Sequence, residues 1–439
     1  MGVKNNMNIA AISTAPGIGG IAVIRVSGPQ AISIIDRIFV PFKEGNLLSC
    51  RKSHTLTYGQ IVDTQSKEVV DEVVVSLFKA PHSFTGEDVI EISCHGSIYI
   101  QKRILELILA EEGMRLAQPG EFTRRAFANG RMDLSQAEAV ADLIASQNAA
   151  SHRLAMSQMK GSISRKLSQL REQLLTMTSL LELELDFSEE DVEFADRTQL
   201  LALAHDIDSE VTHLAATFST GQAIKNGIPV AIIGAPNVGK STLLNQLLKD
   251  DRAIVSPIQG TTRDLIEDTI TLGGFLFRFI DTAGIRNTDD QIEALGIERS
   301  MKAAKRAHII ILLNEPGVDF INVDARHDQH IIRITNKTEQ FSALNNIGIE
   351  QLEQQLISLA QPIESQGDII LTNRRHFDAL NNAHLSLCNV ISALQSQLSG
   401  DLVAEDLRAV IESLNSVLGQ SITSQDTLNN IFKNFCIGK

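Results

Sequence analysis

Residues 234–241 read Gly-Ala-Pro-Asn-Val-Gly-Lys-Ser, and this octapeptide restricts the possible folds more than any other part of the chain. It follows an apolar run at 230–233 and precedes a helical pattern at 243–248. A glycine-rich turn between a strand and a helix is the context that a phosphate-binding loop requires, because backbone N–H groups then surround the phosphates. We predict that Lys240 supplies charge to the outer phosphate oxygens and that the Ser241 hydroxyl ligates Mg²⁺.

Two polar segments further along the chain complete a nucleotide site of the switching type. Asp281-Thr-Ala-Gly284 ends a strand-like run at 275–280, which puts a carboxylate beside the metal and a glycine N–H near a γ-phosphate. Between the two motifs, the loop at 260–264 carries Thr262, whose hydroxyl completes the Mg²⁺ ligands. The order and spacing of the three segments favour a GTPase over an ATPase of the same fold.

Base recognition is expected from Asn336-Lys-Thr-Glu339, which follows a strand-like run at 331–335, with Ser342-Ala343 close behind. Glu339 stands where the usual pattern has Asp, and its extra methylene displaces the carboxylate from the guanine edge unless the loop shifts, at a cost of about 1–3 kcal/mol. The stretch at 314–331 is short for a crossover helix. Three residues between the last two motifs are too few for a further helix and strand.

Helical sequence flanks this α/β segment on both sides. No proline occurs from 121 to 228, and leucines recur at helical spacing between 167 and 185; helical spacing returns from 373 to 435. Residues 8–120 instead show short β-prone runs with two amphipathic helices, at 31–40 and 98–110. We predict an α/β plus all-α protein: an N-terminal mixed α/β domain (1–120), a discontinuous helical domain (121–222 and 367–439) and an inserted Ras-like P-loop domain (223–366).

Composition excludes several classes of protein. The net charge of −14 argues against a broad basic surface for nucleic acid. The four cysteines lie far apart with no CxxC pair, which argues against a disulfide framework or a zinc ribbon and favours a reducing, cytoplasmic location. No apolar run approaches the roughly 18 residues of a membrane span. The adjacent Cys94 and His95 lie on a predicted strand and point to opposite faces, so a structural role is favoured over a nucleophile–base pair.

Further motifs make the chain resemble one family over its whole length, the MnmE (TrmE) tRNA modification GTPases. These motifs are Gly-Gly-Ile-Ala-Val-Ile-Arg-Val-Ser-Gly at 19–28, Ser-Phe-Thr-Gly-Glu-Asp at 83–88, Pro-Gly-Glu-Phe-Thr-Arg-Arg-Ala-Phe at 119–127, Asp-Phe-Ser-Glu-Glu-Asp at 186–191 and Phe-Cys-Ile-Gly-Lys at 435–439. The resemblance implies a folate-binding N-terminal domain and a homodimer. It also implies a heterotetramer with the flavoprotein MnmG (GidA) that adds an aminomethyl or carboxymethylaminomethyl group to the wobble uridine of certain tRNAs.

By the same resemblance, the one-carbon unit comes from a tetrahydrofolate, in its 5-formyl or 5,10-methylene form, held by Arg25, Glu87 and Arg131. K⁺ takes the place of an arginine finger and is ligated by Asn237, Ser256, Ile258 and Thr261. Glu293 orients the attacking water, and Cys436 is a thiolate near the folate, although a small buried side chain is the other interpretation of this cysteine. The residues expected to contact GTP or its cations are Asn237, Val238, Gly239, Lys240, Ser241, Thr242, Ser256, Pro257, Ile258, Gln259, Gly260, Thr261, Thr262, Asp281, Thr282, Ala283, Gly284, Asn336, Lys337, Glu339, Ser342 and Ala343.

Two other functions stay open at this stage. Glu339 and the short 314–342 region favour a folate-binding scaffold that binds nucleotide weakly and hardly turns over. A GTPase that assists ribosome assembly would leave the wobble nucleosides unchanged.

Overall fold

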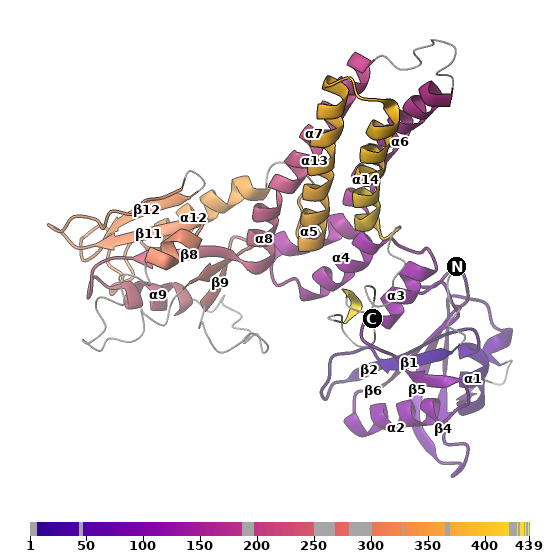
Figure 1. Cartoon of the computed structure of the whole chain (residues 1–439). Helices are drawn as coiled ribbons and strands as arrows, with labels where there is room; N and C mark the ends of the chain where they lie inside the picture. Colours follow the sequence, from indigo (N-terminus) through magenta and orange to yellow (C-terminus); the bar gives the residue numbers. More distant parts are fainter. Residues whose placement is uncertain are drawn as a thin grey trace. The chain divides into compact units, whose positions relative to one another are not determined.

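Two separate β-sheets organise the chain in the computed structural model, and each belongs to its own compact unit. The structure describes residues 7–43, 47–186, 197–249, 268–280, 301–326, 329–364 and 369–420, together with 428, 431–433, 435 and 438. One unit combines residues up to 141 with those from 415 onward, and the other comprises 142–414. Figure 1 shows the elements of both units along the chain.

The sheet of the N-terminal unit has the strand order β3-β4-β5-β6-β2-β1-β7. Neighbouring strands are antiparallel except β1 and β7, which are parallel. Its strands are β1 (Asn8–Ile12), β2 (Ile21–Ser27), β3 (Phe39–Pro41), β4 (Thr55–Val62), β5 (Val69–Phe78), β6 (Val89–His95) and β7 (Met114–Leu116).

Alternation of side chains along these strands builds a different core on each face of the sheet. In β5, Val73, Val75 and Leu77 are buried in one cluster with the inner side chains of α1 (Ala31–Ile38) and α2 (Ile98–Leu109). On the opposite face Ile9 and Phe122 meet, the latter from α3 (Glu121–Ala128). The predicted mixed α/β domain is therefore confirmed, and its second face is where α3 lies.

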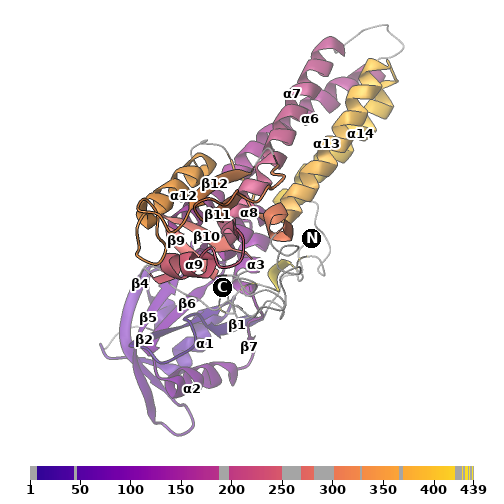
Figure 2. The ribbon, with the colours of Figure 1, turned by 90° about the vertical axis from the view of Figure 1, so that its left-hand side faces the viewer.

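Long helices form much of the other unit. They are α5 (Ala149–Met159), α6 (Ser162–Asp186), α7 (Arg197–Ala216), α8 (Phe218–Asn226) and α13 (Arg374–Gln395), while α4 (Leu134–Ala145) and α14 (Gly400–Leu418) each contain residues of both units. The regularly spaced Leu167, Leu170, Leu174 and Leu181 are buried, as predicted. Packing of α7 against α13 joins sequence from before and after the α/β segment (Figure 2).

The second sheet has the order β12-β11-β8-β10-β9. Its strands are β8 (Ile228–Ile233), β9 (Asp268–Leu272), β10 (Phe275–Phe279), β11 (Ile309–Asn314) and β12 (His330–Thr335). Four strands are parallel, as predicted, but β9 was not predicted and runs antiparallel to β10. The helices α9 (Lys240–Lys249) and α12 (Ile349–Glu364) contribute buried leucines to the core of this sheet.

The short connections predicted in this domain are confirmed. Residues 315–326, which follow β11, contain no helix, although β11 and β12 are parallel neighbours. After β12, residues 336–348 form turns and one isolated bridge between Ser342 and Ile347, and the chain then enters α12. Among the described residues, β12 therefore stays at the edge of the sheet.

The chain enters and leaves this α/β part at one place. Gln222 of α8 donates a hydrogen bond to the Thr372 carbonyl at 2.6 Å, and the Leu371 N–H donates to the Thr217 hydroxyl at 3.0 Å. A Cβ at Gly221 would lie 1.9 Å from the Leu371 carbonyl oxygen, so glycine is required for this close approach.

Within the described residues, no helix is both long and apolar enough to cross a membrane.

Candidate functional site: a phosphate-binding loop and a buried arginine–glutamate network

The glycine-rich loop lies between β8 and the first turn of α9, as the sequence predicts. Gly239 has φ +100°, and a Cβ there would lie 2.3 Å from the Asn336 amide nitrogen. Gly234 is restricted by space alone, since a Cβ there would lie 2.2 Å from the Leu313 carbonyl oxygen. Both glycines therefore let a neighbouring group approach the loop closely, and the first turn of α9, where backbone N–H groups can bind a phosphate, follows directly.

Lys240 is the cation of this loop. Its ammonium donates hydrogen bonds to the carbonyl oxygens of Gly234 and Ala235, at 2.9 and 2.8 Å. Burial lowers the pKa of Lys240, because the charged form is partly removed from water. A phosphate placed in the loop would offer this ammonium an anionic partner and so favour its charged form.

Asn336 connects the phosphate loop to the segment that follows β12. Its side chain is buried; the amide nitrogen donates to the Val238 carbonyl at 2.7 Å, and the amide oxygen accepts from the Ala343 N–H at 3.0 Å. The two segments predicted to read the base are thus held together with the phosphate loop by one side chain. The motif predicted Asn336, but not that it makes this bridge.

Lys337 and Glu339 lie on the exposed side of the same segment. The Lys337 ammonium contacts the Asn237 carbonyl at 3.3 Å and pairs with Glu315, the first residue after β11. Sequence reasoning missed Glu315, although a carboxylate directly after a central parallel strand is a recognisable signal.

The structure brings together the predicted residues on either side of Asn336. These are Asn237, Val238, Gly239, Lys240, Ser241, Thr242, Asn336, Lys337, Glu339, Ser342 and Ala343. The other predicted nucleotide, cation and catalytic residues lie outside the described residues: Ser256, Pro257, Ile258, Gln259, Gly260, Thr261, Thr262, Asp281, Thr282, Ala283, Gly284, Glu293 and Cys436.

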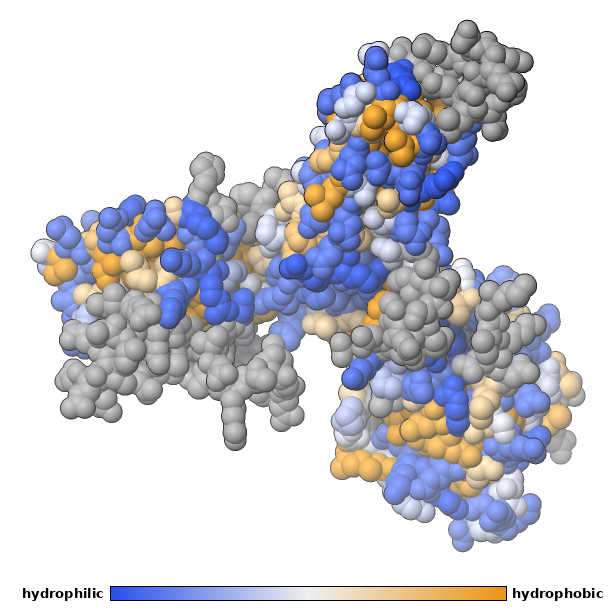
Figure 3. Space-filling view, viewed as in Figure 1, coloured by the Kyte–Doolittle hydropathy of each residue, from blue (hydrophilic) through white to orange (hydrophobic). Residues whose placement is uncertain are grey.

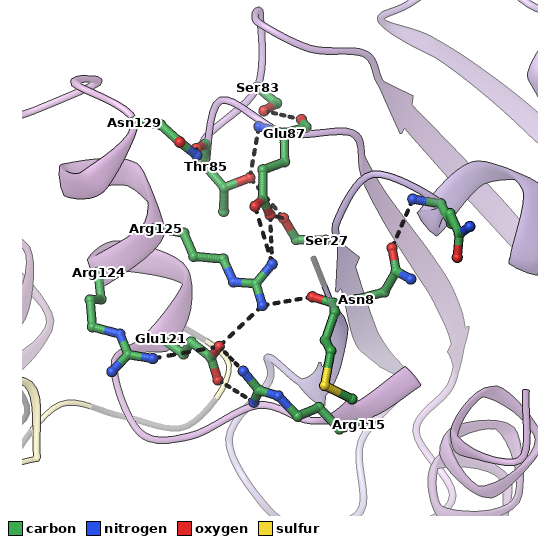
Figure 4. A network of polar contacts seen from close by, with 12 residues as sticks. Asn8, Ser27, Ser83, Thr85, Glu87, Arg115, Glu121, Arg124, Arg125 and Asn129 are labelled. Carbon is green, nitrogen blue, oxygen red and sulfur yellow. Dashed lines mark hydrogen bonds and ion pairs between the residues drawn. The ribbon is translucent and has the colours of Figure 1, made fainter. Parts of the chain in front are cut away.

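In the N-terminal unit, Glu87 is the centre of a second polar site (Figure 4). Its carboxylate accepts hydrogen bonds from the Ser27 hydroxyl at 2.8 Å and from the Arg125 guanidinium at 2.9 and 3.1 Å. Thr85 contacts the Ser27 hydroxyl at 2.8 Å, and Asn129 donates to the Thr85 carbonyl. Loop 83–88 is therefore fixed from both β2 and α3.

Arg125 extends this network to a second carboxylate, Glu121, which is fully buried. Glu121 also accepts two hydrogen bonds from Arg115, at 2.5 and 2.7 Å, and one from the Gln118 N–H. Burial alone would raise the pKa of Glu121, but the Arg115 hydrogen bond, the Gln118 N–H and the charges of Arg125 and Arg115 outweigh it and lower that pKa. The sequence singled out neither Arg125 nor Glu121 as a site residue.

The three predicted folate residues gather at loop 83–88. Glu87 belongs to the loop, the Arg25 guanidinium lies 5.6 Å from the ring centre of Phe84, and the Arg131 side chain lies against Gly86. Arg25 also forms a salt bridge with Glu91 at 2.8 Å.

The C-terminal segment reaches the same region, since Arg25 and Ser13 both donate to the Gly438 carbonyl, at 3.2 and 3.0 Å.

Cys94 and His95 have the structural role that the sequence favours. Cys94 is buried, and burial, with the nearby Asp71, raises the pKa of its thiol to about 11. His95 points to the other face and contacts the Asp71 carboxylate at 2.7 Å. A thiol with so high a pKa is almost fully protonated at neutral pH and is a poor nucleophile.

Two family models cover nearly the whole chain. Residues 8–131 match the model described as the GTP-binding protein TrmE N-terminus, and residues 134–436 match the MnmE helical domain.

Curated relatives match along their full length as well. The chain is 54% identical to the tRNA modification GTPase MnmE of Parabacteroides distasonis, covering 98% of this chain and 99% of the relative. It is 50% identical to the MnmE of Bacteroides fragilis and 46% identical to that of Flavobacterium johnsoniae, in both cases covering 99% of this chain and 100% of the relative. The chain therefore belongs to the MnmE family, whose curated members are named tRNA modification GTPases.

Proposed function

We propose that this protein is a cytoplasmic, K⁺-dependent GTPase that works with an MnmG-type flavoprotein on tRNA. The modification is the addition of an aminomethyl or carboxymethylaminomethyl group to C5 of the wobble uridine, with a tetrahydrofolate as one-carbon donor. The observation that carries the proposal is the assembled phosphate loop, in which Asn336 joins Val238 to Ala343. The G domain is proposed to span 223–366, between two segments of one helical domain (121–222 and 367–439), after an N-terminal domain at 1–120.

At the nucleotide, Lys240 and the N–H groups of the first turn of α9 bind the phosphates. Ser241 and Thr262 hold Mg²⁺, with the Asp281 carboxylate beside it. When bound, Mg²⁺ neutralises charge that develops on the β- and γ-phosphate oxygens. Lys240 is well suited to this role, because its partly buried ammonium exchanges two loop carbonyls for phosphate oxygens. Glu293 is proposed to orient the attacking water.

For the cation, Asn237, Ser256, Ile258 and Thr261 are the proposed K⁺ ligands. Asn237 is exposed at the tip of the loop with φ +63°, a conformation that asparagine tolerates better than most residues. A cation that takes over the role of an arginine finger accelerates GTP hydrolysis by up to about 10³–10⁵-fold, which corresponds to about 4–7 kcal/mol in the activation barrier.

At loop 83–88, Arg25, Glu87 and Arg131 are proposed to hold the folate. Glu87 accepts three hydrogen bonds, and a carboxylate has about four acceptor sites, so one is left for a pterin N–H. Arginine binds the carboxylates of the folate tail in a bidentate manner. Cys436, which lies outside the described residues, is proposed as a thiolate that acts at this site, as the family resemblance implies.

The proposed partners fit the surface chemistry. The chain has a net charge of −14, so the flavoprotein is proposed to supply most of the positively charged surface that binds tRNA. Figure 3 shows apolar residues gathered on the visible face of the N-terminal unit, and Ile18, Ile21, Leu56 and Ile98 of this unit are all at least 60% exposed. Exposed apolar side chains of this size support association of two copies through the N-terminal domain.

A folate-binding scaffold with little turnover is the second candidate. The observation that favours it is the short connection pattern around β12, together with the exposed Glu339 in the base-reading segment.

Hydrolysis of GTP and ATP by the purified chain, in K⁺ and in Na⁺ at matched ionic strength, separates the two candidates. We expect GTP turnover at least about tenfold faster in K⁺, with ATP inert, which corresponds to about 1.4 kcal/mol or more in the barrier. Equal and negligible rates in both salts would favour the scaffold. Lys240→Ala is the control for a contaminating hydrolase.

A further inference from the structure

Among the residues that the structure describes, one group of three metal-ligating side chains comes together, and it lies in the helical part. Asp208 of α7 and His384 and Cys388 of α13 each place one ligand atom within 4.8 Å of the other two. The Asp208 carboxylate contacts His384 Nδ1 at 2.6 Å, and the Cys388 sulfur lies 3.8–3.9 Å from the ring nitrogens of His384. None of the three belongs to a motif identified in the sequence.

The chemistry of this group suits a borderline-soft divalent metal. A thiolate, a neutral imidazole and a carboxylate are the ligand types that Zn²⁺ takes. In the protonation states that bind a metal, the three side chains together carry a charge of −2, which balances the charge of the ion. His384 and Cys388 are four residues apart, so one helical face presents both. Asp208 and His384 are partly exposed and Cys388 is exposed, which gives an ion access from solvent.

The distances are close to those of a tetrahedral site. Zn–N, Zn–O and Zn–S bonds of about 2.0–2.3 Å put neighbouring ligand atoms roughly 3.3–3.6 Å apart. The sulfur is now about equally far from both ring nitrogens, 3.9 Å from Nδ1 and 3.8 Å from Nε2, so the Cys388 side chain must rotate toward Nδ1 to share a metal with it. The carboxylate must retreat from 2.6 Å as the hydrogen bond is replaced. The Thr212 hydroxyl, 3.4 Å from Nδ1, lies beside the group as a further polar partner.

We propose that Asp208, His384 and Cys388 form a binding site for Zn²⁺ or a similar divalent transition metal, with the fourth position open to water. Its ligands come from α7 and α13, which precede and follow the α/β part of the chain. Metal binding would therefore connect the two sequence segments of the helical part through coordination bonds. The site is separate from the phosphate loop and from the Glu87 network, and it does not depend on the proposed function.

The test uses Co²⁺ as a spectroscopic probe on the full chain, treated with chelator and then saturated with Mg²⁺–GDP to occupy the phosphate loop. We expect one equivalent of Co²⁺ to produce a thiolate-to-metal absorption band in the near ultraviolet and the visible bands of tetrahedral coordination. Zn²⁺ should displace it. Cys388→Ser should abolish the thiolate band and weaken Zn²⁺ binding at least about tenfold, and Asp208→Asn should weaken it while retaining the band.

Cys50→Ser is the matched control, because Cys50 is also an exposed free cysteine but lies in the N-terminal unit. Urea unfolding without metal should give the same midpoint for the parent and Cys388→Ser, since an exposed thiol contributes little to packing. With saturating Zn²⁺ the midpoint should rise equally for the parent and for Cys50→Ser, and less for Cys388→Ser. A thiolate band that persists in Cys388→Ser, or a Zn²⁺ affinity unchanged by that substitution, would overturn the proposal.

Discussion

The Asn336 side chain shows how much of the nucleotide site depends on one buried amide. Its two hydrogen bonds satisfy the Val238 carbonyl and the Ala343 N–H, and both groups belong to loops that have no regular secondary structure. A buried backbone group that loses its partner costs about 1–3 kcal/mol, so the phosphate loop and the base-reading segment depend on the same residue.

We expect Asn336→Ala to weaken Mg²⁺–GDP binding by about 10–100-fold, because about 1.4–2.8 kcal/mol of loop organisation is lost. Titration calorimetry with the full chain measures it. Gln340→Ala, an exposed change in the same segment, is the control and should bind as the parent does. If Asn336→Ala lowers only the unfolding free energy and leaves the GDP affinity intact, the bridge stabilises the fold without organising the site.

The buried Glu121 permits a second prediction at the scale of single residues. Glu121→Gln removes a buried charge that pairs with both Arg115 and Arg125, of which Arg125 keeps Glu87 as a second partner. The substitution should lower the free energy of unfolding by about 3–5 kcal/mol in urea titrations at pH 7. The control is Glu106→Gln, whose partners Lys102 and Arg103 are both on the surface, with an expected loss below about 1 kcal/mol. A similar, small loss in both variants would show that the buried pairs do not stabilise the unit.

The same residue predicts how stability depends on pH. Because the pKa of Glu121 is lowered in the folded chain, its contribution is fully present above its ordinary value of 4.5 and is lost as the pH falls through the lower, folded-state pKa. The difference in unfolding free energy between the parent and Glu121→Gln should therefore be constant from about pH 8 to 5 and shrink below about pH 4.5. A difference that grows on acidification would contradict this sign.

Among the elements, the start of α3 is tightly restricted by the C-terminal segment. Gly120 precedes the helix with φ +66°, and a Cβ there would lie 2.8 Å from Phe435 Cβ and 2.9 Å from the Phe432 carbonyl oxygen. Gly130 has nearly the same φ, +70°, but a Cβ there meets nothing within 4 Å. The two glycines thus both have a positive φ, but only Gly120 has neighbouring atoms where a side chain would stand.

Gly120→Ala should destabilise the N-terminal unit by about 2–4 kcal/mol, and Gly130→Ala by about 1 kcal/mol, since only the first adds overpacking to the cost of a positive φ. Chemical denaturation followed by circular dichroism provides both values. If the two variants lose the same unfolding free energy, the C-terminal segment moves to make room for the new methyl group at little cost in free energy.

Sequence patterns predicted the elements that have strong periodicity and missed those that do not. The apolar runs of β8 and β11 and the leucine spacing of α6 are long enough to identify a strand or a helix. In β9 only Ile270 and Leu272 are buried, and β3 and β7 have three residues each, so periodicity hardly exists in them.

The candidate sites divide in the same way. Lys240 and Ser241 follow from a local motif, whereas the bond from Asn336 to Val238 spans 98 residues and that from Arg25 to Gly438 spans 413. Such pairs are set by tertiary packing, which no local pattern encodes.

For the molecule as a whole, the two compact units have separate hydrophobic cores. We expect calorimetry to resolve two transitions, of which Mg²⁺–GDP raises the one that belongs to residues 142–414. At 100 times the dissociation constant the ligand contributes about 2.7 kcal/mol, or a shift of about 5–10 °C. Glu121→Gln should lower the other transition, and a joint shift of both would instead indicate a single cooperative unit.

The pairing of α7 with α13 has a consequence for how the protein is made. Roughly 160 residues separate the two helices in the sequence. A ribosome that adds about 5–20 residues per second needs about 8–30 s to synthesise this intervening segment. During that interval α7, whose buried residues include Leu200, Ile207 and Val211, lacks α13, the helix it packs against in the finished chain. We therefore expect a chaperone that binds apolar helices to bind the nascent chain. The expected period of binding is the time during which the α/β part is synthesised.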